Sequence, residues 1–208
     1  MWHASSSRFL AHRNRFPDDM KSILFLIAVF ALLAEYAVAG PPFPELVDPN
    51  PNPGNNFGAD ILALSTGNVV VTSPNDDAGG TDAGAVYLFN GATGALISTL
   101  TGSTIANNVG SGGVVDLRNG NYVVLSPAWD NGAITNTGAA TWGSGTVGIS
   151  GVVSSLNSLV GQSNYDVVGR GVTVLTNGNY VVHGGWSMTW GNGTAGSKGI
   201  VDASNSLL

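Results

Sequence analysis

The sequence predicts an all-β protein of tandem four-stranded antiparallel blades, arranged like those of a β-propeller. Residues 68–74 (NVVVTSP) recur as 121–127 (NYVVLSP) and as 179–185 (NYVVHGG), each time directly after a glycine. Their spacing of roughly fifty to sixty residues is typical of a propeller blade. The 208 residues include 30 glycines and only 10% charged residues, with the β-formers in short runs. This composition is typical of strands joined by tight turns.

The first 39 residues are predicted to be a leader with a secretory signal peptide, whose core is 20–39. Lys21 precedes an unbroken apolar run at 22–33, and the small residues at 37–39 offer a cleavage site. A retained membrane anchor is the alternative, but Glu35 interrupts the apolar run before the roughly 20 residues that a span needs. We therefore expect a secreted or cell-surface protein without a stable membrane span after cleavage.

Two further segments precede the repeats. Residues 1–19 lie upstream of a second methionine, Met20, and fit either an upstream start codon or a long basic n-region. Residues 40–54 are predicted to be a proline-rich linker, because the six prolines between positions 40 and 56 forbid a helix or a central strand.

Repeat 1 is predicted at 55–107 and contains one blade. Its four short apolar runs lie at 59–64, 68–73, 84–89 and 95–100. Residues 66–68 (TGN), like their counterparts 119–121 and 177–179 (both NGN), supply Gly and Asn where a hairpin needs positive φ. We therefore expect a tight turn between the first two strands of every repeat. Because this recurrence has a backbone reason, we predict no functional role for these glycines and asparagines.

Repeat 2, predicted at 108–164, keeps the same order of strands, and repeat 3, at 165–208, is predicted to be truncated. Trp129 and Trp142 lie 13 residues apart, whereas Trp186 and Trp190 lie 4 apart, so the loop before the third strand is shorter in repeat 3. Propellers close with about four to eight blades. Three repeats are too few, so we expect an incomplete ring, from a longer array, a degraded gene product or an open stack of sheets. Its open sheet edges favour self-association.

Repeat 1 resembles the FG-GAP repeat of integrin α-subunit-type β-propellers in Phe57-Gly58, in Ser73-Pro74 and in 84–89 (GAVYLF). Repeats 2 and 3 also resemble a bacterial repeat of unknown function from large exported, adhesin-like proteins, in 175–182 (LTNGNYVV) and 189–194 (TWGNGT). Both resemblances imply blades. The calcium-binding FG-GAP copies carry alternating carboxylates between their first two strands, which are missing here, so those sites are not carried over.

Composition excludes several classes of function. Acidic residues outnumber basic ones 13 to 7, and after residue 39 only Arg118, Arg170 and Lys198 are basic. Such a surface repels phosphate backbones, so we expect no nucleic-acid partner. The absence of cysteine excludes disulfides and thiolate metal sites. His183 is the only histidine after the leader, and no nucleophile elbow accompanies it, so we predict no catalytic residue, no cofactor and no enzyme.

Two sets of residues are candidate sites. Asn75, Asp76, Asp77 and Asp82 share a glycine-rich loop and offer enough oxygens for a weak calcium site, but a solvated turn in which Asp and Asn bond their own backbone is the favoured interpretation. Trp129, Trp142, Trp186 and Trp190 are candidates for stacking against sugars, and packing between neighbouring sheets is the alternative. Exposure distinguishes these two roles.

The sequence thus predicts an exported, non-catalytic repeat protein that acts as a cell-surface or extracellular binding or adhesion module, with a glycan or a surface protein as its ligand. The first alternative is a structural spacer, or a decayed fragment of a larger repeat protein, without binding activity. An extracellular hydrolase on the same blades is the third. An exposed row of aromatic side chains would favour binding, and an unpaired third repeat would favour decay.

Overall fold

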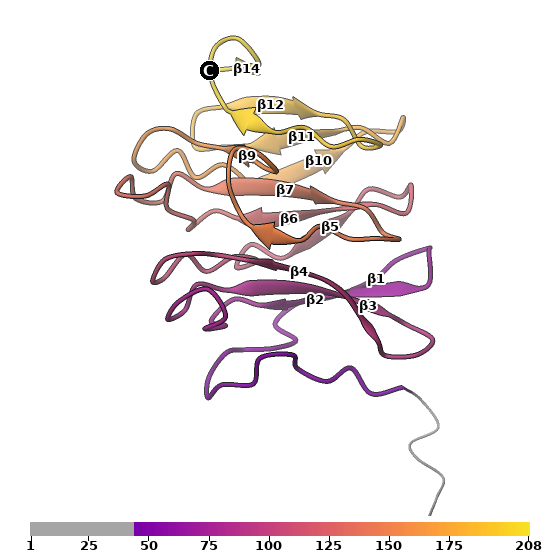
Figure 1. The fold of residues 1–208 in the computed structure, drawn as a ribbon. Helices are drawn as coiled ribbons and strands as arrows, with labels where there is room; N and C mark the ends of the chain where they lie inside the picture. Colours follow the sequence, from indigo (N-terminus) through magenta and orange to yellow (C-terminus); the bar gives the residue numbers. More distant parts are fainter. Residues whose placement is uncertain (1–43) are drawn as a thin grey trace, which may run out of the picture. The chain divides into compact units, whose positions relative to one another are not determined.

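Residues 44–208 are described in the computed structural model of the protein, and they form three β-sheets that follow one another along the chain (Figure 1). The predicted signal peptide and the start of the predicted linker lie outside these residues. Within the described range there is no helix, and hence none that could cross a membrane. The prediction of an all-β fold with three tandem repeats is confirmed, and no closed ring forms among residues 44–208.

Each repeat contributes four strands, in sequence order, to its own antiparallel sheet. Sheet 1 contains β1 (Ile61–Ala63), β2 (Asn68–Ser73), β3 (Ala85–Asn90) and β4 (Leu96–Thr101). Sheet 2 contains β5 (Val114–Asp116), β6 (Tyr122–Ser126), β7 (Ala139–Gly143) and β9 (Leu159–Val160). Sheet 3 contains β10 (Gly171–Val174), β11 (Tyr180–His183), β12 (Met188–Gly191) and β14 (Ser206–Leu207). The predicted shortening of the loop before β12 is confirmed.

Sheets 1 and 2 are each joined to the next repeat by one short parallel strand, a feature that the sequence did not predict. After β7 the chain crosses back to sheet 1, where β8 (Gly151–Val152) pairs in parallel with β4. After β12 it crosses back in the same way, and β13 (Gly199–Ile200) pairs in parallel with β9 of sheet 2. Each of these two sheets therefore has a fifth strand that belongs to its successor.

The tight turns between the first two strands are confirmed, but the role assigned to their asparagines is wrong. Gly67, Gly120 and Gly178 have φ of 84°, 88° and 82°, a region that only glycine adopts without strain. Asn119 and Asn177 have ordinary backbone angles. Their side-chain oxygens instead accept hydrogen bonds from the amides two residues on, as in Asx turns.

The core lies between the sheets, because alternate residues of each strand point to opposite faces. Between sheets 1 and 2 the buried side chains include Leu88, Leu100 and Tyr122, and between sheets 2 and 3 they include Leu117, Leu159 and Tyr180. Both tyrosines lie over a glycine on the neighbouring strand, Gly143 or Gly191, where an added Cβ would overlap the ring. The missing side chain makes room for the aromatic ring.

The remaining face of sheet 1 is covered by the chain that leads into it. Leu46 and Phe57 pack on a cluster that includes Tyr87 and Phe89 of β3. The Phe57 ring lies 6.0 Å from that of Tyr87 and 6.1 Å from that of Phe89, between centroids. Part of the segment predicted to be a linker therefore caps the first sheet.

Candidate functional site

Sheet 3 has one face on sheet 2 and an opposite face, here called the outer face, that no described residue covers. Strand alternation places Thr173, Val181, His183, Met188, Trp190 and Leu207 on it. Trp190 is 51% exposed, Met188 56% and Leu207 78%. Trp186, in the turn between β11 and β12, is 87% exposed. In Figure 1 this sheet forms the yellow end of the stack.

The same strand positions are buried in sheet 2. In the strand register, Met188 and Leu207 of sheet 3 correspond to Ala140 and Leu159 of sheet 2. Ala140 is 1% exposed and Leu159 is 2% exposed, because sheet 3 covers them. The exposure of the outer face thus results from its position in the stack, and not from a change to polar side chains. Exposed apolar patches of this kind mark interaction sites.

A shallow, open groove lies on the outer face. The groove, of about 510 Å³, runs between Val181, Met188 and Trp190 on one side and residues 204–207 on the other. Its walls are mainly apolar, with the hydroxyl of Ser206 bonded to Thr189 Oγ1 at 2.7 Å beneath them. At the far end of β11, His183 Nε2 lies 3.0 Å from Thr173 Oγ1. The groove therefore offers a partner a shaped, mainly apolar surface.

The four tryptophan candidates are separated by the structure into two pairs. Trp129 is 4% exposed and belongs to the core between sheets 1 and 2, which is incompatible with stacking on a ligand. Trp142 is half-buried at the junction of sheets 2 and 3, and its indole nitrogen donates to the Gly193 carbonyl at 3.0 Å. Trp186 and Trp190 have open ring faces, so only this second pair is available to a partner.

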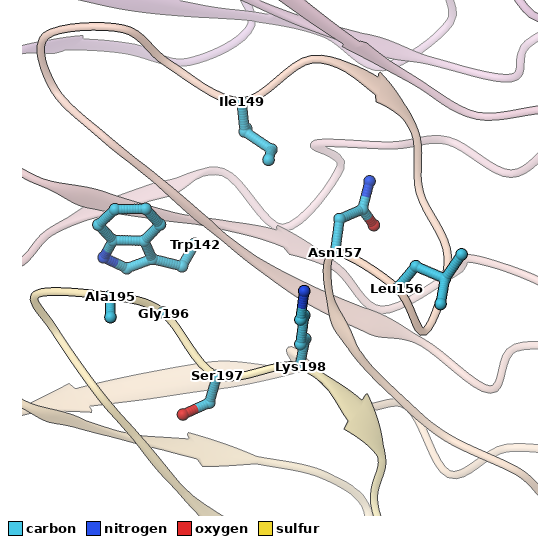
Figure 2. Close-up of a pocket in the computed structure, with 8 residues that line it drawn as sticks. All are labelled: Trp142, Ile149, Leu156, Asn157, Ala195, Gly196, Ser197 and Lys198. Atoms are coloured by element: carbon cyan, nitrogen blue, oxygen red, sulfur yellow. The ribbon is translucent and has the colours of Figure 1, made fainter.

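A smaller pocket of about 270 Å³ lies beside Trp142, where the chain crosses between neighbouring sheets (Figure 2). Trp142 and the backbone of Ala195 and Gly196 form one side, and Leu156 and Lys198 form the other. The Asn157 amide is already committed, because it donates to Val152 O and accepts from Ser154 N. Ser197 Oγ is used by its own turn, where it accepts from Asn192 N at 3.0 Å, and Lys198 brings a charged group to the pocket.

The loop proposed as a weak calcium site is built around a buried carboxyl group. Asp76 is fully buried, and it accepts hydrogen bonds from Tyr87 Oη and Asn50 Nδ2, both at 2.7 Å, and from Ala78 N at 2.8 Å. Burial, with the bond to Asp76, raises the pKa of Tyr87. Asp76 therefore fastens the cap of sheet 1 to β3.

The other members of this loop are used locally as well. Asp77 Oδ1 accepts from Asp82 N at 2.9 Å, and Asn75 Oδ1 accepts from Asn108 Nδ2 at 3.3 Å. Across residues 44–208 no three Asp, Glu, His or Cys side chains converge as metal ligands do. The solvated-turn interpretation describes Asp77 and Asp82, and a structural role describes Asp76.

A set of side chains that the sequence did not single out joins neighbouring sheets. Asn68 Nδ2 donates to Gly145 O at 2.8 Å, and Asn121 Nδ2 donates to Gly193 O at 3.0 Å, each across a sheet junction. The recurrence of asparagine after each turn glycine was the available signal. The sequence pattern predicts that these asparagines shape the turn, whereas Asn68 and Asn121 bond to the next repeat.

Comparison with known protein families assigns the repeats. The model of a repeat of unknown function, DUF5650, matches residues 63–111, 116–170 and 174–208, one match for each sheet. These matches cover more than half of the chain, so the protein belongs to this repeat family. No curated protein matches it.

Proposed function

We propose that this DUF5650 protein is an exported, non-catalytic binding module of the cell surface or extracellular space, and that its outer face contacts the partner. The exposure of Trp190, Met188 and Leu207 on a single sheet face is the observation that carries this proposal. Tryptophan is among the residues that dominate the binding energy at protein interfaces. The predicted signal peptide supports the export part of the proposal.

The structural-spacer alternative is the second candidate, and the parallel strands β8 and β13 favour it. They bind each sheet to its successor through the backbone, which suits a stiff stack of repeats. The decayed-fragment alternative lacks such support, because β10, β11, β12 and β14 are all paired in sheet 3. A spacer would not need the exposed tryptophans, and this difference separates the two candidates.

Export is tested by expressing the full chain with its own leader in a bacterial host and sequencing the N-terminus of the extracellular product. Cleavage after Ala39 would leave Gly40 as the first residue. An uncleaved chain that stays in the cytoplasm would contradict export.

Binding is tested with the same product on a glycan array and on immobilised bacterial and host-cell surfaces. We expect a triple variant, Trp186→Ser, Trp190→Ser and Leu207→Ser, to lose at least about tenfold in affinity, as hot-spot residues do. The matched control is Ile105→Ser with Val147→Ser, two similarly exposed apolar residues outside sheet 3. Equal binding by both variants would exclude the outer face, and no binding by any form would favour the spacer.

A further inference from the structure

The junction between sheets 2 and 3 is centred on one backbone carbonyl. Gly193, in the turn that follows β12, accepts hydrogen bonds from Asn119 Nδ2 at 2.9 Å, Asn121 Nδ2 at 3.0 Å and Trp142 Nε1 at 3.0 Å. All three donors come from sheet 2. A carbonyl of sheet 3 is thus held by a cluster of donors on the preceding sheet.

The junction between sheets 1 and 2 has the same design. The equivalent turn glycine, Gly145, accepts from Thr66 Oγ1 and Asn68 Nδ2 of sheet 1, both at 2.8 Å. The contact therefore recurs from one junction to the next, although the donor residues change in part.

Sheet 3 carries the complete donor cluster for a further junction. Register equates Asn177, Asn179 and Trp190 with Asn119, Asn121 and Trp142. Asn179 Oδ1 accepts from Gly193 N at 3.1 Å, as Asn121 Oδ1 accepts from Gly145 N at 3.2 Å, so both amides are oriented alike. No acceptor among residues 44–208 engages the Nδ2 groups of these two asparagines or the Trp190 indole.

The edge of sheet 3 shows the second half of the same design. In sheets 1 and 2 the fourth strand receives a parallel strand from the next repeat: Leu100 pairs with Gly151, and Leu159 pairs with Gly199. Leu207 holds the equivalent position on β14, and within the described chain its edge is unpaired. Unpaired edges are templates for strand addition.

We infer that the outer face is a docking surface for a further sheet of this same repeat family. The inference rests on the proposed binding role of this face and specifies its partner. That partner offers a turn-glycine carbonyl to Asn177, Asn179 and Trp190, and a parallel Gly-Ile or Gly-Val strand to β14. Apolar side chains of its facing strands fill the groove beside Met188 and Leu207.

A second copy of this chain is a poor partner. Two outer faces would oppose donors to donors, with no carbonyl between them. The free side of sheet 1 is covered by Leu46 and Phe57 and fastened by Asp76, so a head-to-tail contact would first displace this cap. The surface therefore selects a repeat sheet whose facing side is uncovered.

The test lengthens the full chain after Leu208 by a copy of residues 161–208, which reproduces the natural step from Val160 to Gly161. We expect the copied sheet to cover the outer face, so that hydrogen exchange of the Trp190 indole N–H slows by at least about tenfold. Trp190→Phe identifies the resonance in the NMR spectrum. A matched chain whose copied segment carries Val182→Asp, on the side that faces sheet 2 in the parent, should lose this protection.

Amide exchange across the first three sheets reports whether the lengthened chain is folded. If those sheets are protected while the Trp190 N–H exchanges freely, or if the copied segment alone is unfolded, the inference is overturned. The unmodified chain is also run by analytical ultracentrifugation at increasing concentration, and dimers that protect Trp190 would replace the inference with self-pairing. Cell-surface or glycan binding that needs Trp190, combined with failure of the lengthened chain, would keep the proposed function and reject this partner.

Discussion

Sheets 1 and 3 are built from the same repeat but differ in how their free faces are treated. Sheet 1 carries Tyr87 and Phe89, which pack under Phe57, and the Tyr87 hydroxyl donates to Asp76. Sheet 3 has Thr189 and Gly191 at those strand positions, and its opposite face exposes Trp190. Terminal repeats of stacked proteins need a polar or covered outer side for solubility. The difference shows that one end of the described stack is sealed and the other is suited to contact.

The largest effect should be common to both end sheets, because it concerns the turn that all repeats share. An alanine Cβ at Gly91 or Gly193 would overlap the carbonyl oxygen of Gly67 or Gly178 in the neighbouring hairpin. We expect Gly91→Ala and Gly193→Ala each to lower the free energy of unfolding by at least about 4 kcal/mol in urea denaturation.

The matched control for these two variants is Gly132→Ala. Gly132, unlike Gly91 and Gly193, has a positive φ, 65°, and nothing lies within 4 Å of an added Cβ. Only the backbone conformation is then penalised, by about 1 kcal/mol. A similar loss for Gly91→Ala would show that the turn of sheet 1 can move aside, so that the two ends differ even here.

The second prediction concerns the segment that caps sheet 1. Asp76→Ala would leave the buried Tyr87 hydroxyl and the Ala78 amide without their acceptor, which costs about 3 kcal/mol in unfolding free energy. Urea denaturation followed by tyrosine fluorescence measures this loss. Asp77→Ala, at the exposed neighbouring position, should change stability by no more than about 0.5 kcal/mol. Equal losses would mean that the cap is not fastened through Asp76.

The third prediction compares two equivalent tryptophans. Trp142→Ala removes an indole that packs on Gly196 and donates to Gly193, so we expect a loss of about 2–3 kcal/mol. Trp190→Ala removes an exposed ring and should stay within about 0.5 kcal/mol of the parent. Denaturation curves of both variants decide this. A large loss at Trp190 would mean that the outer face is already covered, for example by self-association.

The sequence was informative where local chemistry determines structure. Glycines at the hairpin turns and short apolar runs placed the strands of sheet 1 within two residues of their observed ends. The strands β8 and β13 were missed because two residues are too few to show a period, and their partners lie in the preceding repeat. The cap was missed because a proline-rich segment packs without regular hydrogen bonds, leaving no pattern to detect.

The candidate site was predictable only as a set of residue types. Stacking and packing were both open for each of the four tryptophans, because their sequence context does not separate Trp142 from Trp190. Both precede a glycine and follow a threonine on a third strand. Within residues 44–208 a further sheet covers that of Trp142 and none covers that of Trp190, which is a property of the stack and not of the local sequence.

The smallest effect at neutral pH concerns the tyrosines that join the sheets. Burial raises the pKa of Tyr122 and of Tyr180 to about 12. A raised pKa means that the folded state disfavours the phenolate, so this contribution to stability is constant below the unfolded value of about 10. As the pH rises from about 10 towards 12, the free energy of unfolding falls by up to about 1.4 kcal/mol per pH unit for each tyrosine.

Tyr180→Phe separates this titration from packing, because the ring stays while the ionisable group is lost. The Tyr180 hydroxyl makes no hydrogen bond of good geometry within residues 44–208, so the variant should match the parent at pH 7 to within about 0.5 kcal/mol. Above pH 10 it should lose stability more slowly than the parent in urea denaturation. Tyr165→Phe is the control for the same substitution at an exposed position. If Tyr180→Phe instead follows the parent curve up to pH 12, the hydroxyl is solvated in the folded state, and the junction between sheets 2 and 3 is looser than that between sheets 1 and 2.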